Sequence, residues 1–169
     1  IAHVLLDGAE EVCHVKTTGR CRELLVPGAS VLLCESGVPG RLTNYDLISV
    51  YKNGRIVNID SHAPNRVFRE WVERGGLFRN TVSLRPEQRF GASRFDFQAE
   101  SSGRTAFVEV KGVTLEEDGV ARFPDAPTER GLRHVRELVS CLEAGYDAFL
   151  CFVVQMKGVT YLEANRAAQ

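Results

Sequence analysis

Two short alternating segments joined by a tight turn constrain the fold of this chain more than any other feature of its sequence. Side chains alternate between the two faces of a β-strand, so residues 93–98 and 105–111 each have one apolar and one charged face. Both phenylalanines of the first segment fall on its apolar face. Ser102-Gly103 is a turn dipeptide between the segments. The sequence therefore predicts an antiparallel hairpin with its tip at Ser102-Gly103.

The register of this hairpin gathers four charged residues. The position of the tip places Asp96 directly opposite Glu109, and Arg94 and Lys111 form the next pair on the same face. Like charges directly opposite each other destabilise a sheet, so the two carboxylates need a cation. The pattern leaves two interpretations open. The four charges form diagonal ion pairs, or the two acids bind a hard divalent cation with Lys111 beside it as a partner for an anionic substrate.

Residues 1–60 have the pattern of a small β-barrel. Short β-like runs are separated by turn residues, and Asn53-Gly54 is the strongest turn signal because both residues tolerate a positive φ. The expected strands are 1–6, 12–16, 30–34, 47–52 and 55–60. Five strands at this spacing predict an OB-like barrel, although an SH3-like barrel has a similar pattern.

Two helices are expected beyond a break at residues 61–65. Asn65 can cap a helix over 66–74, in which Trp71 lies on the apolar stripe and belongs to the core. A second helix is expected over 128–144. Its apolar face, which the pattern predicts to be buried, comprises Leu132, Val135, Leu138, Val139 and Leu142.

Strands accompany these helices. They are expected at 81–85, 93–98, 105–111 and 148–154, with a loop after 111. Pro86 cannot donate to a ladder, so the first of these strands belongs at a sheet edge or at a bulge. The order of elements indicates an α/β (α+β) fold with two domains, residues 1–62 and 63–169.

Composition and charge exclude several classes of protein. The chain is 44% apolar and 25% charged, as in ordinary globular proteins, and its longest apolar run of seven residues is about a third of a membrane-spanning helix. The net charge of −1 excludes a global basic field, so any nucleic-acid contact must be local. Five cysteines without Cys-x-x-Cys spacing indicate a reducing compartment and neither a disulfide framework nor a zinc site.

Longer motifs give the chain a family resemblance. Asp96, twelve residues and then Glu109-Val110-Lys111 resemble the PD-(D/E)XK nuclease superfamily, whose acid, acid-x-Lys hairpin binds Mg²⁺ and positions a water for phosphodiester hydrolysis. Essentially the whole chain resembles the sugar fermentation stimulation protein A family. The matching segments are residues 18–20, 23–29, 57–65, 93–97, 107–115, 123–131 and 152–155. Relatives continue beyond residue 169, so part of the second domain is expected to be absent.

The resemblance implies a fold, a setting and a metal site. The fold is an OB-like β-barrel followed by a PD-(D/E)XK nuclease-like mixed sheet flanked by helices, in a bacterial or archaeal cytoplasm. The metal is Mg²⁺ or Mn²⁺, bound by Asp96 and Glu109 and completed by Glu70 on the preceding helix. Lys111 would act on the phosphate or on the attacking water. From its sequence position alone, Glu70 is an ordinary surface acid.

The expected partner is DNA, single-stranded or structured. Arg130 and His134 lie in the first turns of the second helix, opposite its apolar face, where the positive helix end can receive phosphate. Gln155 matches a family position that orients a phosphate or water. The candidate nucleic-acid contacts are Arg20, Arg94, Arg130, His134 and Gln155.

Two functions remain open at this point. The first is a metal-dependent phosphodiesterase with Asp96, Glu109 and Lys111 as catalytic residues and the barrel holding a single strand. The second is a non-catalytic DNA-binding regulator of sugar catabolism genes that uses the nuclease-like fold as a platform. Tyr45 and Tyr51 are the barrel's only aromatic residues, which is thin support for stacking of bases.

Overall fold

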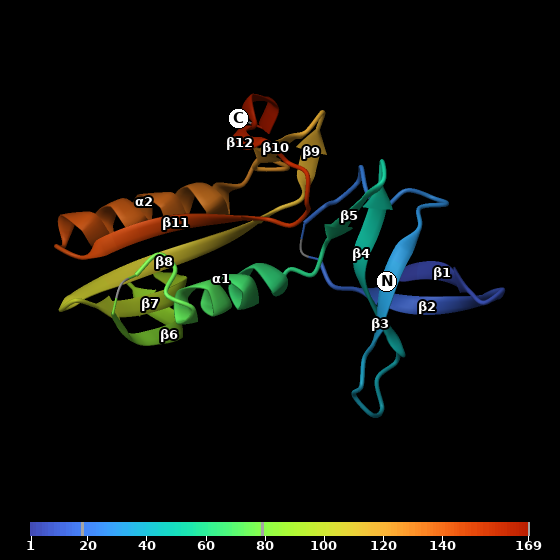
Figure 1. Cartoon of the computed structure of the whole chain (residues 1–169), viewed down its shortest axis with the longest axis horizontal. Helices are drawn as coiled ribbons and strands as arrows, with labels where there is room; N and C mark the ends of the chain where they lie inside the picture. Colours follow the sequence, from blue (N-terminus) through green and yellow to red (C-terminus); the bar gives the residue numbers. More distant parts are fainter. Residues whose placement is uncertain (18, 79, 169) are drawn as a thin grey trace. The chain divides into compact units, whose positions relative to one another are not determined.

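The computed structural model describes residues 1–17, 19–78 and 80–168 and has two compact units (Figure 1). Each unit is built from separate stretches of sequence. Unit 1 comprises Ile1–Ala63, Val113–Ala126 and Val154–Gln169, and unit 2 comprises Pro64–Gly112 and Pro127–Val153. The boundary expected after residue 62 falls at the end of the first stretch of unit 1, and two later stretches join that unit. Among the described residues, no helix is long and apolar enough to cross a membrane.

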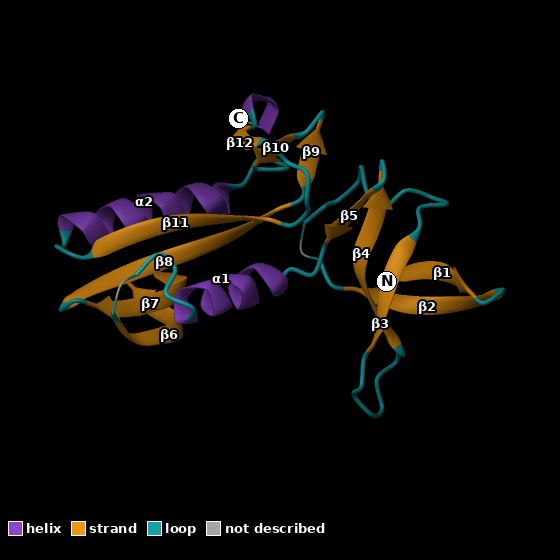
Figure 2. Ribbon diagram, viewed as in Figure 1, coloured by secondary structure: helices purple, strands orange, loops and turns teal. Residues whose placement is uncertain are grey.

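Five strands form the N-terminal sheet of unit 1 (Figure 2). They are β1 (Ala2–Leu6), β2 (Ala9–Val15), β3 (Val31–Glu35), β4 (Tyr45–Lys52) and β5 (Arg55–Asn58). The order is β1-β2-β4-β3, with β5 paired to β4. All five predicted strands are confirmed to within three residues at each end. The predicted turn is confirmed as well, since Asn53 and Gly54 have φ values of 51° and 75°.

Asp46, at the start of β4, is a buried acid with partners on both oxygens. Its Oδ1 accepts from His14 Nδ1 and Arg41 Nη2, both at 2.9 Å, and its Oδ2 accepts from Arg41 Nη1 at 3.2 Å. Lys16 Nζ lies 3.8 Å from Oδ2. The hydrogen bonds from Arg41 are the main cause that lowers the pKa of Asp46 to about 2, against the opposing effect of burial.

A second, small sheet of unit 1 forms where the sequence predicts a loop and beyond it. It consists of β9 (Leu115–Glu117), β10 (Val120–Phe123) and β12 (Tyr161–Ala164) in the order β12-β10-β9, and a 3-10 turn follows at Arg166–Ala168. Strands of three or four residues are too short to show an alternating pattern. Glu116 joins this sheet to the barrel, because its carboxylate pairs with Arg55 and its backbone oxygen accepts from Lys52 Nζ at 3.0 Å.

Unit 2 is a four-stranded sheet between two helices. The elements are α1 (Ala63–Glu73), β6 (Thr81–Phe90), β7 (Ser93–Ser101), β8 (Arg104–Val113), α2 (Glu129–Glu143) and β11 (Asp147–Val154), and the strand order is β11-β8-β7-β6. The strand that contains Pro86 lies at the edge of the sheet, as predicted. Val108 packs in one cluster with Phe68 of α1, whereas Phe107 packs with Leu138 of α2. Neighbouring residues of a strand point to opposite faces, so the helices cover opposite faces of the sheet (Figures 1 and 2).

The predicted hairpin forms, but the expectation that both phenylalanines share one face is wrong. Phe97 contacts Phe68 of α1, with ring centroids 5.2 Å apart, whereas Phe95 contacts Phe107 on the α2 side at 5.7 Å. The β7–β8 ladder has the predicted register and runs from Phe97↔Val108 to Ser101↔Arg104. Beyond it, at residue 96, a side chain takes over the pairing with β8, and strict alternation ends there.

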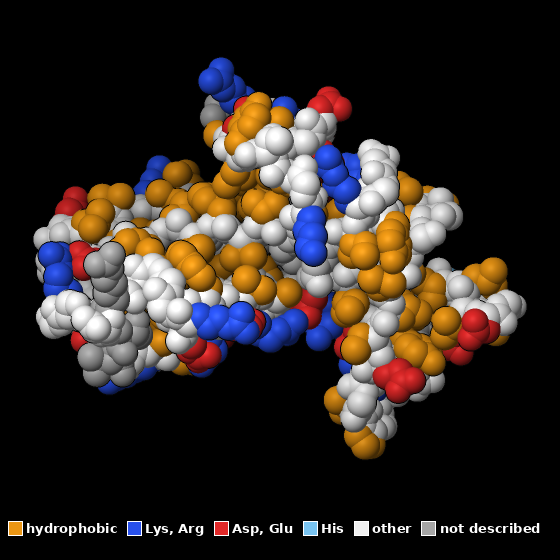
Figure 3. Space-filling model, viewed as in Figure 1, with side chains coloured by type: hydrophobic (Ala, Val, Ile, Leu, Met, Phe, Trp, Pro, Cys, Tyr) orange, Lys and Arg blue, Asp and Glu red, His pale blue; other side chains and the backbone are white. Residues whose placement is uncertain are grey.

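Both helices differ from their predicted faces. In α2 the buried residues are His134, Leu138 and Cys141. Four of the five residues expected inside, Leu132, Val135, Val139 and Leu142, are 41–55% exposed, and Figure 3 shows hydrophobic side chains on the visible surface over α2. Trp71 of α1, expected in the core, is 47% exposed. Asn65 lies inside the first turn of α1, which begins at Ala63, instead of preceding the helix as a cap.

Candidate functional site

Glu109 is the most deeply buried acid of unit 2, with 3% of its surface exposed. It lies on β8 with its side chain toward α2. Its Oε1 accepts from Lys111 Nζ at 2.5 Å and also from His134 Nδ1. Its Oε2 is buried and has no hydrogen-bond partner in the part of the chain that the structure describes. Two donors therefore share one oxygen, and the other oxygen is free to accept.

The sequence positions these three residues by two periodicities. Glu109 and Lys111 are two apart on β8, so they share a face. His134, Leu138 and Cys141 are spaced four and three apart on α2 and share its buried stripe. The imidazole of His134 also packs against Phe95, with ring centroids 6.4 Å apart. His134 is thus a partner of Glu109 inside the unit, which corrects the expectation of a surface position.

Asp96 is held from the other side of the sheet. Its Oδ1 accepts from Asn65 Nδ2 of α1 at 2.9 Å, and its Oδ2 accepts from the backbone N–H of Val110 at 2.8 Å. Backbone N–H groups of a strand point within the plane of the sheet, so Asp96 lies beside β8 at the residue that follows Glu109. Both acids therefore meet the same short stretch of β8, and their convergence on one cation stays a prediction.

Glu70, the third expected metal ligand, is not brought to the two acids. Its side chain is exposed on α1 and pairs with Arg74, with 2.5 Å between Oε1 and Nη2. Within the described ranges, no group of three or more His, Cys, Asp and Glu side chains is arranged to hold a metal ion. Of the three carboxylates expected to hold a cation, only Asp96 and Glu109 lie at the same stretch of β8.

The other candidate contacts to nucleic acid are spread over both units. Arg94 and Arg130 are exposed in unit 2, and Arg94 lies 3.5 Å from Glu87. Arg20 is exposed in unit 1. Gln155 is also in unit 1, where its amide donates to the backbone oxygen of Asn58 at 3.0 Å. The structure thus unites Glu109, Lys111 and His134 in one cluster and gives Gln155 a local role at the end of β5.

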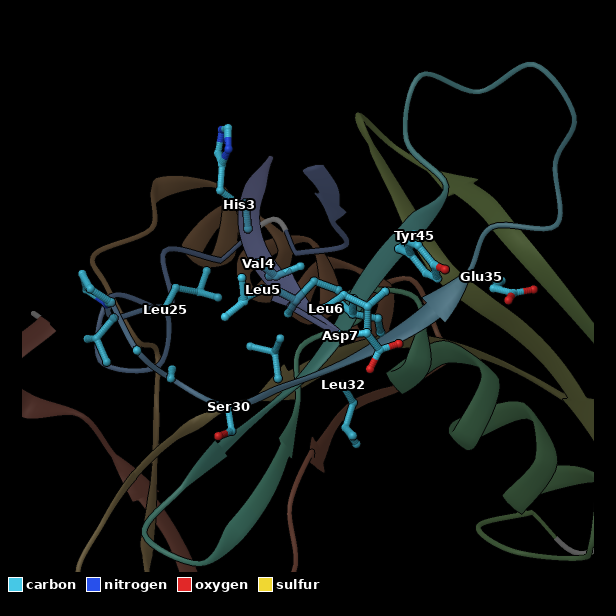
Figure 4. A pocket seen from close by; sticks show the side chains of 18 residues that line it. His3, Val4, Leu5, Leu6, Asp7, Leu25, Ser30, Leu32, Glu35 and Tyr45 are labelled. Atoms are coloured by element: carbon cyan, nitrogen blue, oxygen red, sulfur yellow. The ribbon is translucent and has the colours of Figure 1, made fainter. Parts of the chain in front are cut away.

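A groove in the barrel bears on the expectation that this unit holds a single strand. It has a volume of about 1060 Å³ and is lined by β1, by residues 25–33 and by Tyr45 (Figure 4). Asp7 and Glu35 line it, and none of the described lining residues is Lys or Arg. The described lining of this groove therefore lacks the positive charge that usually attracts a phosphate backbone.

Asn65 is a residue of the candidate site whose contact with Asp96 sequence reasoning missed. Its residue type suits a helix cap, and nothing in the local pattern indicates a bond to a residue 31 positions away. The buried position of His134 could have been found in the sequence. His134 precedes Leu138 by four residues and Cys141 by seven, so the three share one face of α2 that is an alternative to the apolar face through Leu132.

Two family models together match nearly the whole chain. The model described as SfsA N-terminal OB domain matches residues 1–59, and the model described as Sugar fermentation stimulation protein RE domain matches residues 62–169. The OB fold predicted for the first sixty residues is thereby confirmed.

Curated relatives and a solved structure agree with these models. A sugar fermentation stimulation protein homolog from Desulfitobacterium hafniense (strain DSM 10664 / DCB-2) is 56% identical over 98% of this chain and 72% of its own length. A homolog from Clostridium beijerinckii is 50% identical over 98% of this chain and 73% of its own length. The structure of Pyrococcus furiosus SfsA in complex with Ca²⁺ is similar with a TM-score of 0.86 and 28% identity, over 95% of this chain and 70% of that one.

Proposed function

Because this chain belongs to the sugar fermentation stimulation protein family, we propose that it binds a divalent cation at Glu109 and Asp96 and hydrolyses phosphodiester bonds in DNA. The observation that carries this proposal is the buried, unpartnered Oε2 of Glu109, within the described residues, beside Lys111. Buried polar atoms are rarely left without a partner, and an unsatisfied one costs about 1–3 kcal/mol. A cation at Oε2 removes that cost.

The donor set fits a hard cation. Mg²⁺ prefers oxygen ligands and usually takes only one or two protein carboxylates, leaving its other positions to water and to substrate phosphate. Each oxygen of Asp96 accepts a single described hydrogen bond, and a carboxylate oxygen has a second lone pair for a metal. The P. furiosus relative is described in complex with Ca²⁺, another ion that prefers oxygen ligands.

Each residue of the cluster has a distinct chemical task. A bound cation would polarise a phosphate oxygen and make a neighbouring water more acidic. Glu109 and Asp96 supply negative charge to hold it. Lys111 places its ammonium group beside the proposed cation, because Nζ donates a hydrogen bond to Oε1 of Glu109. Part of the Lys111 side chain also reaches solvent. That ammonium can neutralise the charge that develops on the phosphate.

Local positive charge supports DNA as the substrate. Residues 66–94 hold seven arginines against three glutamates, although the whole chain has a net charge of −1. Arg130 is exposed in the first turn of α2, where the helix dipole favours phosphate. DNA affinity should therefore fall steeply with salt.

A second function is favoured by one observation. Asp96 already accepts from both Asn65 and Val110, which is the arrangement of an acid with a structural task. On that basis the same surface would bind DNA without cleaving it, as a regulator of sugar catabolism genes does.

A cleavage assay separates the two functions. The full chain is incubated with single-stranded, double-stranded and branched DNA and with RNA, with and without Mg²⁺ or Mn²⁺. We expect cleavage that needs the metal and is lost in Glu109→Gln. The control is Glu143→Gln, an exposed acid at the end of α2, which should cleave like the wild type. DNA binding without cleavage, unchanged in Glu109→Gln, would favour the regulator.

A further inference from the structure

Helix α2 buries a histidine and leaves apolar side chains in solvent. His134 is 5% exposed, whereas Leu132 and Leu142 of the same helix are more than half exposed. Burying an imidazole is unfavourable unless its polar atoms find partners, and the hydrophobic effect favours turning the leucines inward. The described partner of the buried imidazole is Glu109, and this hydrogen bond offsets the cost of burying His134 on the packed stripe of α2.

The position of that bond decides which oxygen of Glu109 is available. His134 and Lys111 both donate to Oε1, and neither contacts Oε2. A large rotation of the carboxylate about its Cγ–Cδ bond would move Oε1 away from His134, which the packing of α2 holds in place, and from Lys111. The second oxygen is therefore held in a fixed direction while it stays free of protein donors.

We infer that His134 is a positioning residue for the metal site, which fixes the carboxylate of Glu109 so that Oε2 faces the cation. The inference rests on the proposed function. Residues that hydrogen-bond to metal ligands commonly change metal affinity 10- to 100-fold when they are replaced. His134 does so from α2, so the same bond ties the seating of this helix to the binding of the ion.

The test is a calorimetric titration of the full chain with Mn²⁺ alone, without DNA. His134→Asn places an amide nitrogen close to the position of Nδ1, whereas His134→Gln places it near Nε2 and His134→Ala removes the donor. We expect Mn²⁺ affinity to fall about tenfold or more in the Ala and Gln variants and by about threefold or less in His134→Asn. Should His134→Ala not fold, as judged by circular dichroism, the comparison of Asn with Gln decides.

Leu138→Ala is the control for loss of packing. Leu138 lies one turn further along the buried stripe of α2 and has no polar atom. Its truncation should lower the melting temperature at least as much as His134→Ala and leave Mn²⁺ affinity unchanged. If His134→Ala binds Mn²⁺ like the wild type, or if Leu138→Ala weakens binding equally, the inference is wrong while the metal site stands. If the wild type binds no Mn²⁺, or Glu109→Gln binds it equally well, the proposed function fails and the inference with it.

Discussion

Two buried acids, one in each unit, show how differently a fold can treat a carboxylate. Asp46 of the barrel has a donor on each oxygen, and the guanidinium of Arg41 lowers its pKa to about 2. Glu109 of the second unit has two donors on one oxygen and, among the described residues, none on the other. Burial is common to both. Of these two acids, only Glu109 keeps a buried oxygen that no described donor occupies, and this is the oxygen that the proposed cation would use.

Substitutions at the candidate site should change DNA cleavage more than any other property. Asp96→Asn and Lys111→Ala should each lower metal-dependent cleavage about 100-fold or more. The first removes charge that holds the cation, and the second removes charge that acts on the reacting phosphate. Asp96→Asn should also tighten DNA binding without metal, since it removes a negative charge that repels phosphate. Asp46→Asn is the matched control and should still cleave. Cleavage that survives Asp96→Asn would leave only the DNA-binding function.

Binding of Mn²⁺ should also stabilise the folded chain. Mn²⁺ at about 100 times its dissociation constant should stabilise the wild type by about 2.7 kcal/mol, which calorimetry detects as a higher melting temperature. Asp46→Asn should keep this increase and Glu109→Gln should lose it. Equal stabilisation of both variants would mean that the free oxygen of Glu109 does not bind the ion.

Arg41→Ala tests whether the buried acid of the barrel contributes to stability without affecting metal binding. It leaves the buried Asp46 without its main partner, so the melting temperature should fall by at least about 2–4 °C. The melting-temperature increase caused by Mn²⁺ should be unchanged, because Arg41 belongs to unit 1. A variant that loses the metal effect along with its stability would contradict the separation of the two acids.

The smallest effect is a dependence of stability on pH. The pKa of Asp46 is lower in the folded chain than its ordinary value of 3.8, so its contribution to stability is present above about pH 4. It should be lost as the pH falls from about 4 to about 2. Denaturant titrations of wild type and Asp46→Asn across this range measure the difference, which should shrink toward pH 2. A difference that stays constant would show that ionised Asp46 does not stabilise the barrel.

The sequence predicts the strands better than the faces of the helices. Alternation and turn residues suffice for the barrel and for the hairpin, because both signals are local. The packed face of α2 includes a bond between His134 and Glu109, which are 25 residues apart, and a hydrophobic pattern contains no information about such a bond. The apolar stripe through Leu132 and Leu142 is real in the sequence but is not the stripe that packs.

In the candidate site, too, the local features could be predicted and the long-range contacts could not. The register places Asp96 and Glu109 at the same stretch of β8, and the spacing to Lys111 puts the ammonium group beside Glu109. The irregularity at residue 96 could not be predicted, since a side chain of β7 replaces a backbone group as the acceptor for Val110. The bond from Asn65 could not be predicted for the same reason, because it depends on the direction of the Asp96 side chain.

The division of unit 1 into three stretches of sequence has a consequence for how the protein is made. Residues 1–63 leave the ribosome first, but 113–126 and 154–169 belong to the same unit and follow only after most of unit 2 has been synthesised. The nascent barrel can therefore gain partners such as Glu116 only after residues 64–112 of unit 2 have been synthesised. Contacts between distant parts of a chain form slowly and leave apolar surface exposed meanwhile. Folding of unit 1 is thus completed only after the intervening residues of unit 2 have been made.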